Sequence, residues 1–465
     1  MNHSAAGAIW RAAGLAPEAL ERLTLTGGEP VLPSSFAVGR AAQASIAVAA
    51  LAAIEIGQHR GSAPRRAALD MGEAALECTA RYTLDGIARD PWDKLAGLYR
   101  CADGWVRLHT NFAHHRDGLL RLLGLPEGGA TERAAVAQAL AWRGAVAFEQ
   151  EATDRGLVVA ALRSFEQWDA HPHAAVVAAE PLVAIERIGA DAPPLRWPRI
   201  ARPAAPLAGL RALDLTRILA GPFGTRLLAT YGADVLLVNA PHLPNIDAIA
   251  DLSRGKLSAL ADLREPADCD ALRARLRDAH VFVQGYRPGA LGQFGFDAEA
   301  IARERPGIVV ASLSAYGETG PWGGKRGFDS LVQTATGFNV AEAQAAGDDG
   351  KPRALPLQIL DMASGALLAF GAQAALLRQQ TEGGSWRVRV SLARTGLWLR
   401  ELGRVDRGFA VSTDSGADQM EFSTSGWGRL GSIRHAARFA PPLAHALRLS
   451  MPPGTDPLAW PLTRA

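Results

Sequence analysis

Cysteine is scarce in this chain of 465 residues, which contains only 3 of them: Cys78, Cys101 and Cys269. They lie far apart and show neither CxxC spacing nor the pattern of a disulfide framework, which is typical of a protein from a reducing cytoplasm. The adjacent pair His114-His115 has no carboxylate or cysteine spaced to complete a metal site. The sequence therefore predicts a cytoplasmic protein with no metal site.

The chain also lacks an excess of charge of one sign and any long apolar run. It has 49 Lys and Arg against 47 Asp and Glu, a formal net charge of +2, so neither nucleic acid nor an anionic membrane is implied as a partner. The longest apolar stretch, residues 44–56, is too short to span a bilayer and predicts a buried helix. The N-terminus lacks a basic segment followed by an apolar one, so we expect no secretory signal.

Proline is concentrated in a seam at residues 194–206, which predicts a linker between two halves of the chain or an extended crossing strand. Short apolar runs typical of buried parallel strands follow the seam at residues 210–215, 234–238, 281–283 and 308–312. Helical segments are predicted between them at residues 223–231 and 298–305, and Gly232 stands where a helix cap belongs. This alternation of strands and helices predicts a doubly wound α/β sheet.

Two distant segments of the chain, residues 44–71 and 366–392, resemble each other. Each has an Ala-rich helix, then a turn containing glycine, then the start of a basic strand. Aligning Gly61 with Gly383 places Gly39 opposite Asp361. The sequence leaves open whether this is a true repeat or a chance likeness of Ala-rich helices. If the repeat is real, only its second copy carries the carboxylate.

Five motifs follow the seam in order. They are LDLTRILAGPFGTRLLATYGADVLLV (213–238), SRGKLSALADL (253–263), VFVQGYRPGALGQFGFD (281–297), RPGIVVASLSAYGETGPWGGKRGFDSLVQTATG (305–337) and PLQILDMASGALLAFGAQAALL (356–377). Together they resemble the family III CoA-transferases, the group that includes formyl-CoA and carnitine-CoA transferases and the α-methylacyl-CoA racemases. The resemblance implies the fold of that family and an acyl-CoA as substrate.

The first half of the chain resembles the other end of the same family. PWDKLAGLYRCADGWVRLHTNFAHHRDGLLRLLGLP (91–126) and FEQWDAHPHAAVVAAEPLVAIERIG (165–189) are similar to its small domain. Segments like the C-terminal part of one family member thus precede segments like the N-terminal part of another. This order suggests a fusion or permutation in which the two halves complete each other. The domains expected are a family-like segment completing a large domain (1–100), a small α+β domain (101–193), a linker (194–206), a Rossmann-like CoA-binding domain (207–404) and a C-terminal segment of uncertain placement (405–465).

Asp361 is the residue that we expect to carry the chemistry. It follows an apolar stretch and precedes an Ala-rich helix, so its carboxylate stands at a helix N-terminus, which the helix dipole favours. The residues alone leave a plain helix cap as an alternative. The resemblance implies that Asp361 attacks an acyl-CoA thioester, which gives a mixed anhydride and then an aspartyl-CoA thioester.

The candidate CoA-binding residues surround two predicted turns. In the first turn, backbone N–H groups can meet phosphate or thioester oxygens, and its residues are Arg217, Leu219, Ala220 and Gly221. The candidate charges for the CoA phosphates are Arg254, Lys256 and Arg287, and the second turn adds Gly285 and Tyr286 near adenine. Solvated charges and a packed aromatic ring remain the alternative for these side chains.

The sequence departs from the family pattern at several of these positions. Asn239 and Ala240 stand where a Glu and a basic residue are usual, Gly285 replaces an Asn, and Gln293 replaces an Arg. These changes reduce the number of cations available to CoA. Phe328 precedes Asp329 where the racemases carry a His, and the loss of one of two proton-transfer groups disfavours racemisation.

We therefore expect an α/β protein with a Rossmann-like, doubly wound large domain and a smaller α+β domain. The expected function is CoA transfer between an acyl-CoA and a carboxylic acid, with no permanently bound cofactor. The alternatives are an acyl-CoA racemase-like enzyme and a non-catalytic CoA-binding or structural paralogue. The resemblance implies a homodimer, unless the two halves mimic that dimer within one chain.

Overall fold

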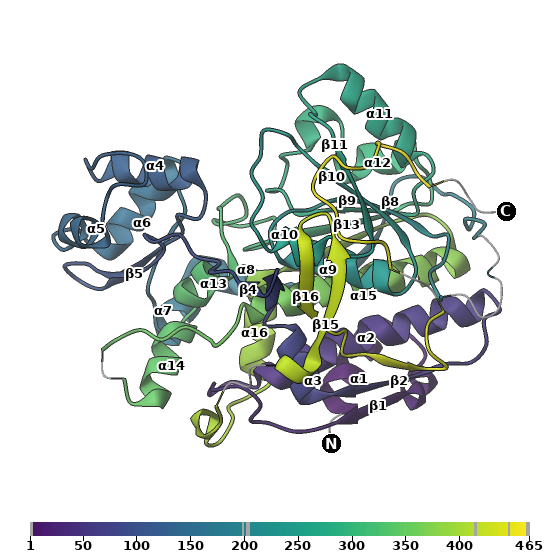
Figure 1. Cartoon of the computed structure of the whole chain (residues 1–465), viewed down its shortest axis with the longest axis horizontal. Helices are drawn as coiled ribbons and strands as arrows, with labels where there is room; N and C mark the ends of the chain where they lie inside the picture. The colour runs from purple at the N-terminus through teal and green to yellow at the C-terminus, as the bar shows by residue number, and fades with distance from the viewer. Residues whose placement is uncertain are drawn as a thin grey trace.

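The largest sheet has seven strands, six of them parallel (Figure 1). The computed structural model describes residues 3–461 apart from 198–199, 201–204, 349, 413–415 and 445–446. The strands are β8 (Ala184–Ile188), β9 (Arg211–Leu215), β10 (Asp234–Asn239), β11 (Lys256–Leu260), β12 (Val281–Gln284), β13 (Val309–Ser314) and β14 (Ser385–Ser391). Their order is β11-β10-β9-β12-β13-β14-β8, with β8 antiparallel to β14. The six parallel strands have the order 3-2-1-4-5-6 of a doubly wound α/β sheet.

The strand residues alternate between two hydrophobic cores, one on each face of this sheet. On β9, Ala212 belongs to one core and Leu213 to the other, as the period of two along a strand requires. The helices in this half of the chain are α9 (Ala220–Thr230), α10 (Ile249–Leu252), α11 (Pro266–Leu276), α12 (Ala298–Glu304), α13 (Asp329–Ala335), α14 (Phe338–Ala346), α15 (Ile359–Glu382) and α16 (Leu392–Glu401). A 3-10 turn, η2 (Gly292–Phe294), lies between β12 and α12. The strands and helices predicted after the seam are confirmed, and Gly232 follows α9 with a φ of 103°.

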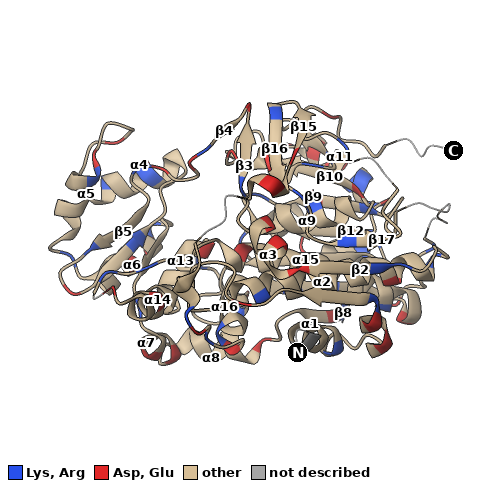
Figure 2. Cartoon of the chain, turned by 60° about the horizontal axis from the view of Figure 1, so that its bottom comes forward, with Lys and Arg blue, Asp and Glu red and all other residues tan. Residues whose placement is uncertain are grey.

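Two long buried helices, α2 (Val38–His59) and α15, pack against each other beneath the large sheet (Figure 2). Both are long and apolar enough to cross a membrane by length and composition, and both lie in the protein core. The predicted buried helix at residues 44–56 is thus part of α2. A strand and a helix follow α2 as β2 (Arg66–Asp70) and α3 (Met71–Glu77), just as β14 and α16 follow α15. The two similar segments of the sequence therefore share the same order of elements.

The two ends of the chain are joined by small sheets. The N-terminal elements are α1 (His3–Ala12), η1 (Pro17–Arg22), β1 (Leu23–Thr26), β3 (Tyr82–Leu84) and β4 (Ile87–Ala88). The C-terminal elements are η3 (Gly408–Ala410), η4 (Ala417–Gln419), β15 (Met420–Ser425), β16 (Gly428–Ile433) and β17 (Arg438–Ala440). β17 completes the sheet β1-β2-β17, and the hairpin β15-β16 extends β3 and β4 into a sheet of four strands. The C-terminal segment thus finds its place by pairing with N-terminal strands.

A smaller unit at the left of Figure 1 has its own core and a sheet of three strands. Its elements are β5 (Gly97–Arg100), β6 (Trp105–Leu108), α4 (Ala113–Leu122), α5 (Arg133–Leu140), α6 (Ala145–Asp154) and β7 (Val159–Ala161), and two helices lead back from it, α7 (Phe165–Asp169) and α8 (Pro172–Ala179). The small domain was expected at residues 101–193, and the structure differs at both ends. β5 begins before residue 101, and β8 belongs to the large sheet. Residues 198–199 and 201–204 of the predicted linker lie outside the described residues.

The buried carboxylate of Glu77 connects α3, α9 and the C-terminal segment. It accepts hydrogen bonds from Arg226 Nη2 at 2.8 Å and from the Ala436 N–H at 2.8 Å, and it lies 3.1 Å from His435 Nδ1. Burial alone would raise the pKa of Glu77, but His435 and Arg226 outweigh it and hold the pKa at about 2. Arg226 also pairs with Asp251 at 3.2 Å. This network fixes the end of the chain to the helix that follows β9.

We expect Glu77→Ala to lower the free energy of unfolding by about 3 kcal/mol or more, because it leaves Arg226 buried without one of its carboxylates. Denaturant unfolding at pH 7 measures the change. The matched control is Glu73→Ala, which removes a more exposed ion pair of α3 with Arg438 and should cost less than about 1 kcal/mol. Equal losses in the two variants would contradict the role assigned to the buried network.

Candidate active site

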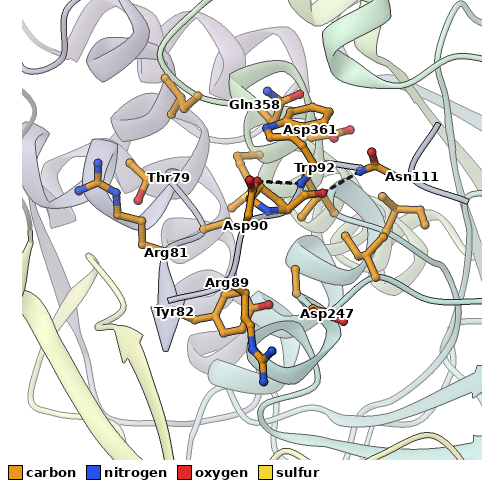
Figure 3. Close-up of a pocket in the computed structure, with 18 of the residues that line it drawn as sticks. Thr79, Arg81, Tyr82, Arg89, Asp90, Trp92, Asn111, Asp247, Gln358 and Asp361 are labelled. Carbon is orange, nitrogen blue, oxygen red and sulfur yellow. Dashed lines mark hydrogen bonds between the residues drawn. The ribbon is translucent and has the colours of Figure 1, made fainter. Parts of the chain in front are cut away.

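A pocket of about 760 Å³ lies where the two halves of the chain meet. Its walls come from segments far apart in the sequence, namely residues 78–83, 88–93, 109 and 111, 218–219, 245–248, 328 and 330, 356–358 and 361–362, together with Met420. Figure 3 shows Asp361 and Gln358 at one end of the pocket, and Tyr82, Arg89 and Asp247 toward the other. The predicted nucleophile therefore lies inside a cavity that the first half of the chain helps to form.

Asp361 is the third residue of α15, and only 7% of its surface is exposed. Its backbone N–H donates a hydrogen bond of 2.8 Å to Asp329 Oδ2. Asp329 is the first residue of α13, and its Oδ1 accepts a hydrogen bond of 2.5 Å from Gln333 Nε2. Asp329 thus caps the N-terminus of α15 from outside that helix, which brings two carboxylates together at the end of the pocket.

Both carboxyl groups are weak acids in this position. Burial raises the pKa of Asp329 to about 7, although hydrogen bonds from the Asp361 N–H and Gln333 favour its charged form. Burial, and then the charge of Asp329, raise the pKa of Asp361 well above its ordinary value. Because two like charges this close disfavour each other, the pair titrates as a unit and retains a proton near neutral pH.

A group of arginines lies beside the pocket at the carboxyl ends of β9, β12 and β13. Arg217 follows β9, Arg287 follows β12, and Arg326 precedes α13. Arg217 lies over the Phe112 ring at 5.7 Å and bonds to the Pro244 carbonyl, and Arg326 Nη1 lies 3.5 Å from His115 Nε2. Within the described ranges none of the three guanidiniums forms an ion pair with a carboxylate. The strand order reverses between β9 and β12, which is where doubly wound sheets bind ligands.

The other residues of the two predicted turns occupy several positions. Leu219 lines the pocket, whereas Ala220 and Gly221 are buried in the first turn of α9. A Cβ on Gly221 would come within 2.4 Å of Thr216 Cβ, so only glycine fits there. Gly285 is exposed, and Tyr286 is partly buried beside Arg217. The structure thus brings Arg217, Tyr286 and Arg287 to one edge of the sheet, and their contact with CoA stays a prediction.

Lys256 and Arg254 require a correction, because neither supplies a free charge to the pocket. Lys256 is fully buried, and its Nζ lies 3.0 Å from Asp214 Oδ2 and 2.7 Å from Thr225 Oγ1. Arg254 pairs with Asp251 at 2.9 Å and with Glu421 at 2.9 Å. Both cations are neutralised by carboxylates of the fold, so we assign them a structural role in place of the predicted contact with CoA phosphates.

Several pocket residues were not singled out from the sequence, although some of them lie within the quoted motifs. They include His109 and Ser330, together with the aromatic and polar side chains of residues 78–93. Arg326 and the pair His114-His115 also lie at the arginine group, where the sequence had offered the histidines only as an unlikely metal pair. In the part of the chain that the structure describes, no group of three His, Cys, Asp or Glu side chains could hold a metal ion.

The carboxylate pair predicts an unusual effect of pH on stability. The folded state binds a proton at this pair more tightly than the unfolded chain does, so the pair lowers the free energy of unfolding as the pH rises from about 4 to 8. Asp361→Asn removes one buried charge. Its free energy of unfolding should therefore exceed that of the natural protein at pH 8, on the order of 1 kcal/mol, and equal it at pH 4. Denaturant unfolding at both values measures this.

Asp247→Asn is the matched control, because Asp247 is an exposed carboxylate of the same pocket. That variant should leave the dependence on pH unchanged. A lower free energy of unfolding for Asp361→Asn at pH 8 would contradict the placement of two coupled carboxyl groups in the core.

Comparisons with known proteins agree with this geometry over part of the chain. The model of CoA-transferase family III matches residues 207–407. A succinate–glutarate CoA-transferase of Agrobacterium fabrum is 30% identical over 206 residues, which cover 40% of this chain and 51% of that protein. A probable fatty acyl-CoA transferase of Mycobacterium tuberculosis is 34% identical over 214 residues, which cover 43% of this chain and 53% of that protein.

The structural likeness is confined to a similar share of the chain. The crystal structure of Rv3272 from Mycobacterium tuberculosis superposes with a TM-score of 0.39 at 31% identity, covering 43% of this chain and 59% of that one. The chain spans about half or less of the length of these and other curated relatives that it matches. The model of CoA-transferase family III thus matches residues 207–407, which are less than half of the chain.

Proposed function

We propose that this protein moves CoA between an acyl-CoA and a carboxylic acid, with Asp361 as the nucleophile and no permanently bound cofactor. The observation that carries the proposal is the buried carboxylate of Asp361 at the N-terminus of α15, inside a pocket of about 760 Å³. A pocket of this size is typical of sites for small-molecule ligands. The relatives named above are CoA-transferases, which supports the same reaction class here.

The reaction needs only acyl transfers on one carboxylate. The Asp361 carboxylate attacks the thioester carbonyl, the C–S bond breaks, and CoA leaves as a thiolate, which gives an acyl-aspartyl anhydride. The thiolate then attacks the aspartyl carbonyl, and the donor acid leaves as a carboxylate. The acceptor carboxylate repeats these steps in reverse and departs as its CoA thioester. Protons balance throughout, because each attacking anion replaces a leaving anion.

The arginine group beside the pocket is the proposed site for the CoA phosphates. Arg217, Arg287 and Arg326 converge at the carboxyl edge of the sheet without carboxylate partners in the described ranges, and planar guanidiniums bind phosphate with two hydrogen bonds each. Burial, and then the nearby charge of Arg287, lower the pKa of Arg326, as expected where like charges gather. An anion bound between them would relieve this repulsion.

Arg287→Ala should weaken the binding of free CoA by about tenfold, because it removes a charge-assisted contact with phosphate. Calorimetric titration with CoA at two salt concentrations measures the affinity, which should also become less dependent on salt in the variant. Arg303→Ala on α12 is the matched control, since Arg303 is another exposed arginine of the same half of the chain. Equal affinities for the two variants would contradict the proposed phosphate site.

Hydroxylamine trapping tests the proposed nucleophile. Incubation with acetyl-CoA or succinyl-CoA and hydroxylamine should convert Asp361 into its hydroxamate, which peptide mass spectrometry detects. Asp361→Asn should form no adduct and lose at least about 10³-fold in CoA transfer, as loss of a nucleophile does in other enzymes. The exposed carboxylate Asp247 offers the control, because Asp247→Asn should still be labelled at Asp361.

The outcomes of trapping separate the alternative functions. No adduct across a panel of acyl-CoAs, with CoA binding retained, would overturn the transferase proposal and favour a binding protein. Exchange of the α-proton for deuterium without acyl transfer would favour a racemase-like enzyme. A cytoplasmic location stays a prediction, and so does a homodimer. The pocket lined by both halves supports the view that one chain completes its own site.

A further inference from the structure

His109 is a buried imidazole in the Asp361 pocket that the proposed reaction has not yet used. It follows β6 in the first half of the chain, and only 6% of its surface is exposed. Its ring stacks on Phe328 at 3.8 Å between centroids with an interplanar angle of 12°. Its Nδ1 is buried with no hydrogen-bond partner among the described residues. Such an atom is rare in a folded protein unless a ligand or water meets it.

The backbone around His109 is held firmly. The His109 N–H donates to the Val158 carbonyl at 3.2 Å. Thr110 Oγ1 donates to Asp93 Oδ1 at 2.7 Å, and Asn111 Nδ2 donates to the Pro91 carbonyl at 2.8 Å. The imidazole is therefore presented from a fixed loop, which is the condition for a preorganised contact with substrate.

Ser330 is a second buried polar group of the same pocket without a partner. It follows Asp329 at the start of α13, and 2% of its surface is exposed. Its Oγ makes no hydrogen bond in the described part of the chain, although it lines the pocket. Ser330 lies two residues after Phe328, on which His109 stacks, and next to Asp329, which binds the Asp361 N–H. Two unpartnered groups thus flank the carboxylate pair.

We propose that His109 and Ser330 donate hydrogen bonds to the carbonyl oxygen of the thioester and of the anhydride, and stabilise the oxyanion that forms there. The assignment rests on the proposed transferase function. When the Asp361 carboxylate attacks, its negative charge moves to this oxygen, and when the C–S bond breaks the charge leaves with the CoA thiolate. Neither His109 nor Ser330 gains or loses a proton in these steps.

The electrostatic surroundings of His109 suit a neutral donor. Burial, and then the nearby His115 and Arg107, lower the pKa of His109 to about 3. The imidazole is therefore uncharged at neutral pH and offers one N–H donor, and a neutral imidazole of this kind can polarise a carbonyl.

The test compares four variants in the full chain. His109→Phe keeps a ring on Phe328 and removes the donor, whereas His109→Gln keeps an N–H donor. Ser330→Ala removes the second donor, and Ser253→Ala is the matched control, because Ser253 is equally buried and unpartnered but lies outside the pocket. The probe is acetyl-CoA or succinyl-CoA, whichever labels the natural protein faster, with hydroxylamine.

We expect His109→Phe and Ser330→Ala each to slow the formation of the Asp361 hydroxamate by about 10²-fold. The KM for the acyl-CoA should change by less than about threefold, because the contact strengthens only in the transition state. His109→Gln should retain more of the rate than His109→Phe, and Ser253→Ala should retain all of it. Thermal unfolding and CoA affinity that match the natural protein verify that each variant is folded.

The result that overturns this proposal is distinct from the one that overturns the function. If the natural protein is labelled and His109→Phe and Ser330→Ala are labelled just as fast, the oxyanion assignment is wrong and the transferase function stands. An equal rise in KM for both variants with an unchanged rate would also overturn it, since that indicates ground-state binding alone. If the natural protein gives no label, the function fails and this assignment fails with it.

Discussion

The hydrogen bond from the Asp361 N–H to Asp329 is the interaction on which the site depends. α15 is a core helix whose first turn is buried, so its leading N–H groups need partners from elsewhere in the chain. Asp329 provides one. Burial, and then the charge of Asp329, raise the pKa of Asp361. The contact therefore positions the proposed nucleophile and places a second carboxylate beside it. Burial of two carboxyl groups is unfavourable, and the hydrophobic packing of the surrounding core, which includes α2 and α15, offsets it.

The start of α2 shows why the repeated architecture has a single site. The Arg40 N–H donates to Glu29 Oε1 at 2.8 Å, so a carboxylate again caps the helix. At Gly39, which the sequence aligns with Asp361, an added Cβ would come within 2.3 Å of Val31 Cγ2. No side chain fits there without displacement of Val31. The carboxylate proposed as the nucleophile is thus present on α15, whereas the matching position of α2 has no room for a side chain.

The sequence predicts the parts of this structure that depend on local pattern. The parallel strands are predictable because a strand buried on both faces is an apolar run. The local pattern alone left Asp361 as a possible helix cap, and only the resemblance carried by the five motifs singled it out. The C-terminal strands are not, because β16 and β17 pair with strands from the opposite end of the chain. Lys256 shows the same limit within the site. The sequence alone does not distinguish a lysine that binds phosphate from one that pairs with Asp214, because the difference lies in the tertiary contacts.

His109 comes from the first half of the chain, whereas the carboxylate pair comes from the second half. The family region, residues 207–407, contains Asp361, Asp329 and Ser330, but His109 and the wall formed by residues 78–93 lie in the first half. Alone, the family region would leave one side of the pocket open to water, which weakens any hydrogen bond to a developing charge. The ion pairs of Glu77 and the strands of the C-terminal segment hold the first half in place. The two halves of the chain therefore line one pocket together, and residues 207–407 alone form only part of its wall.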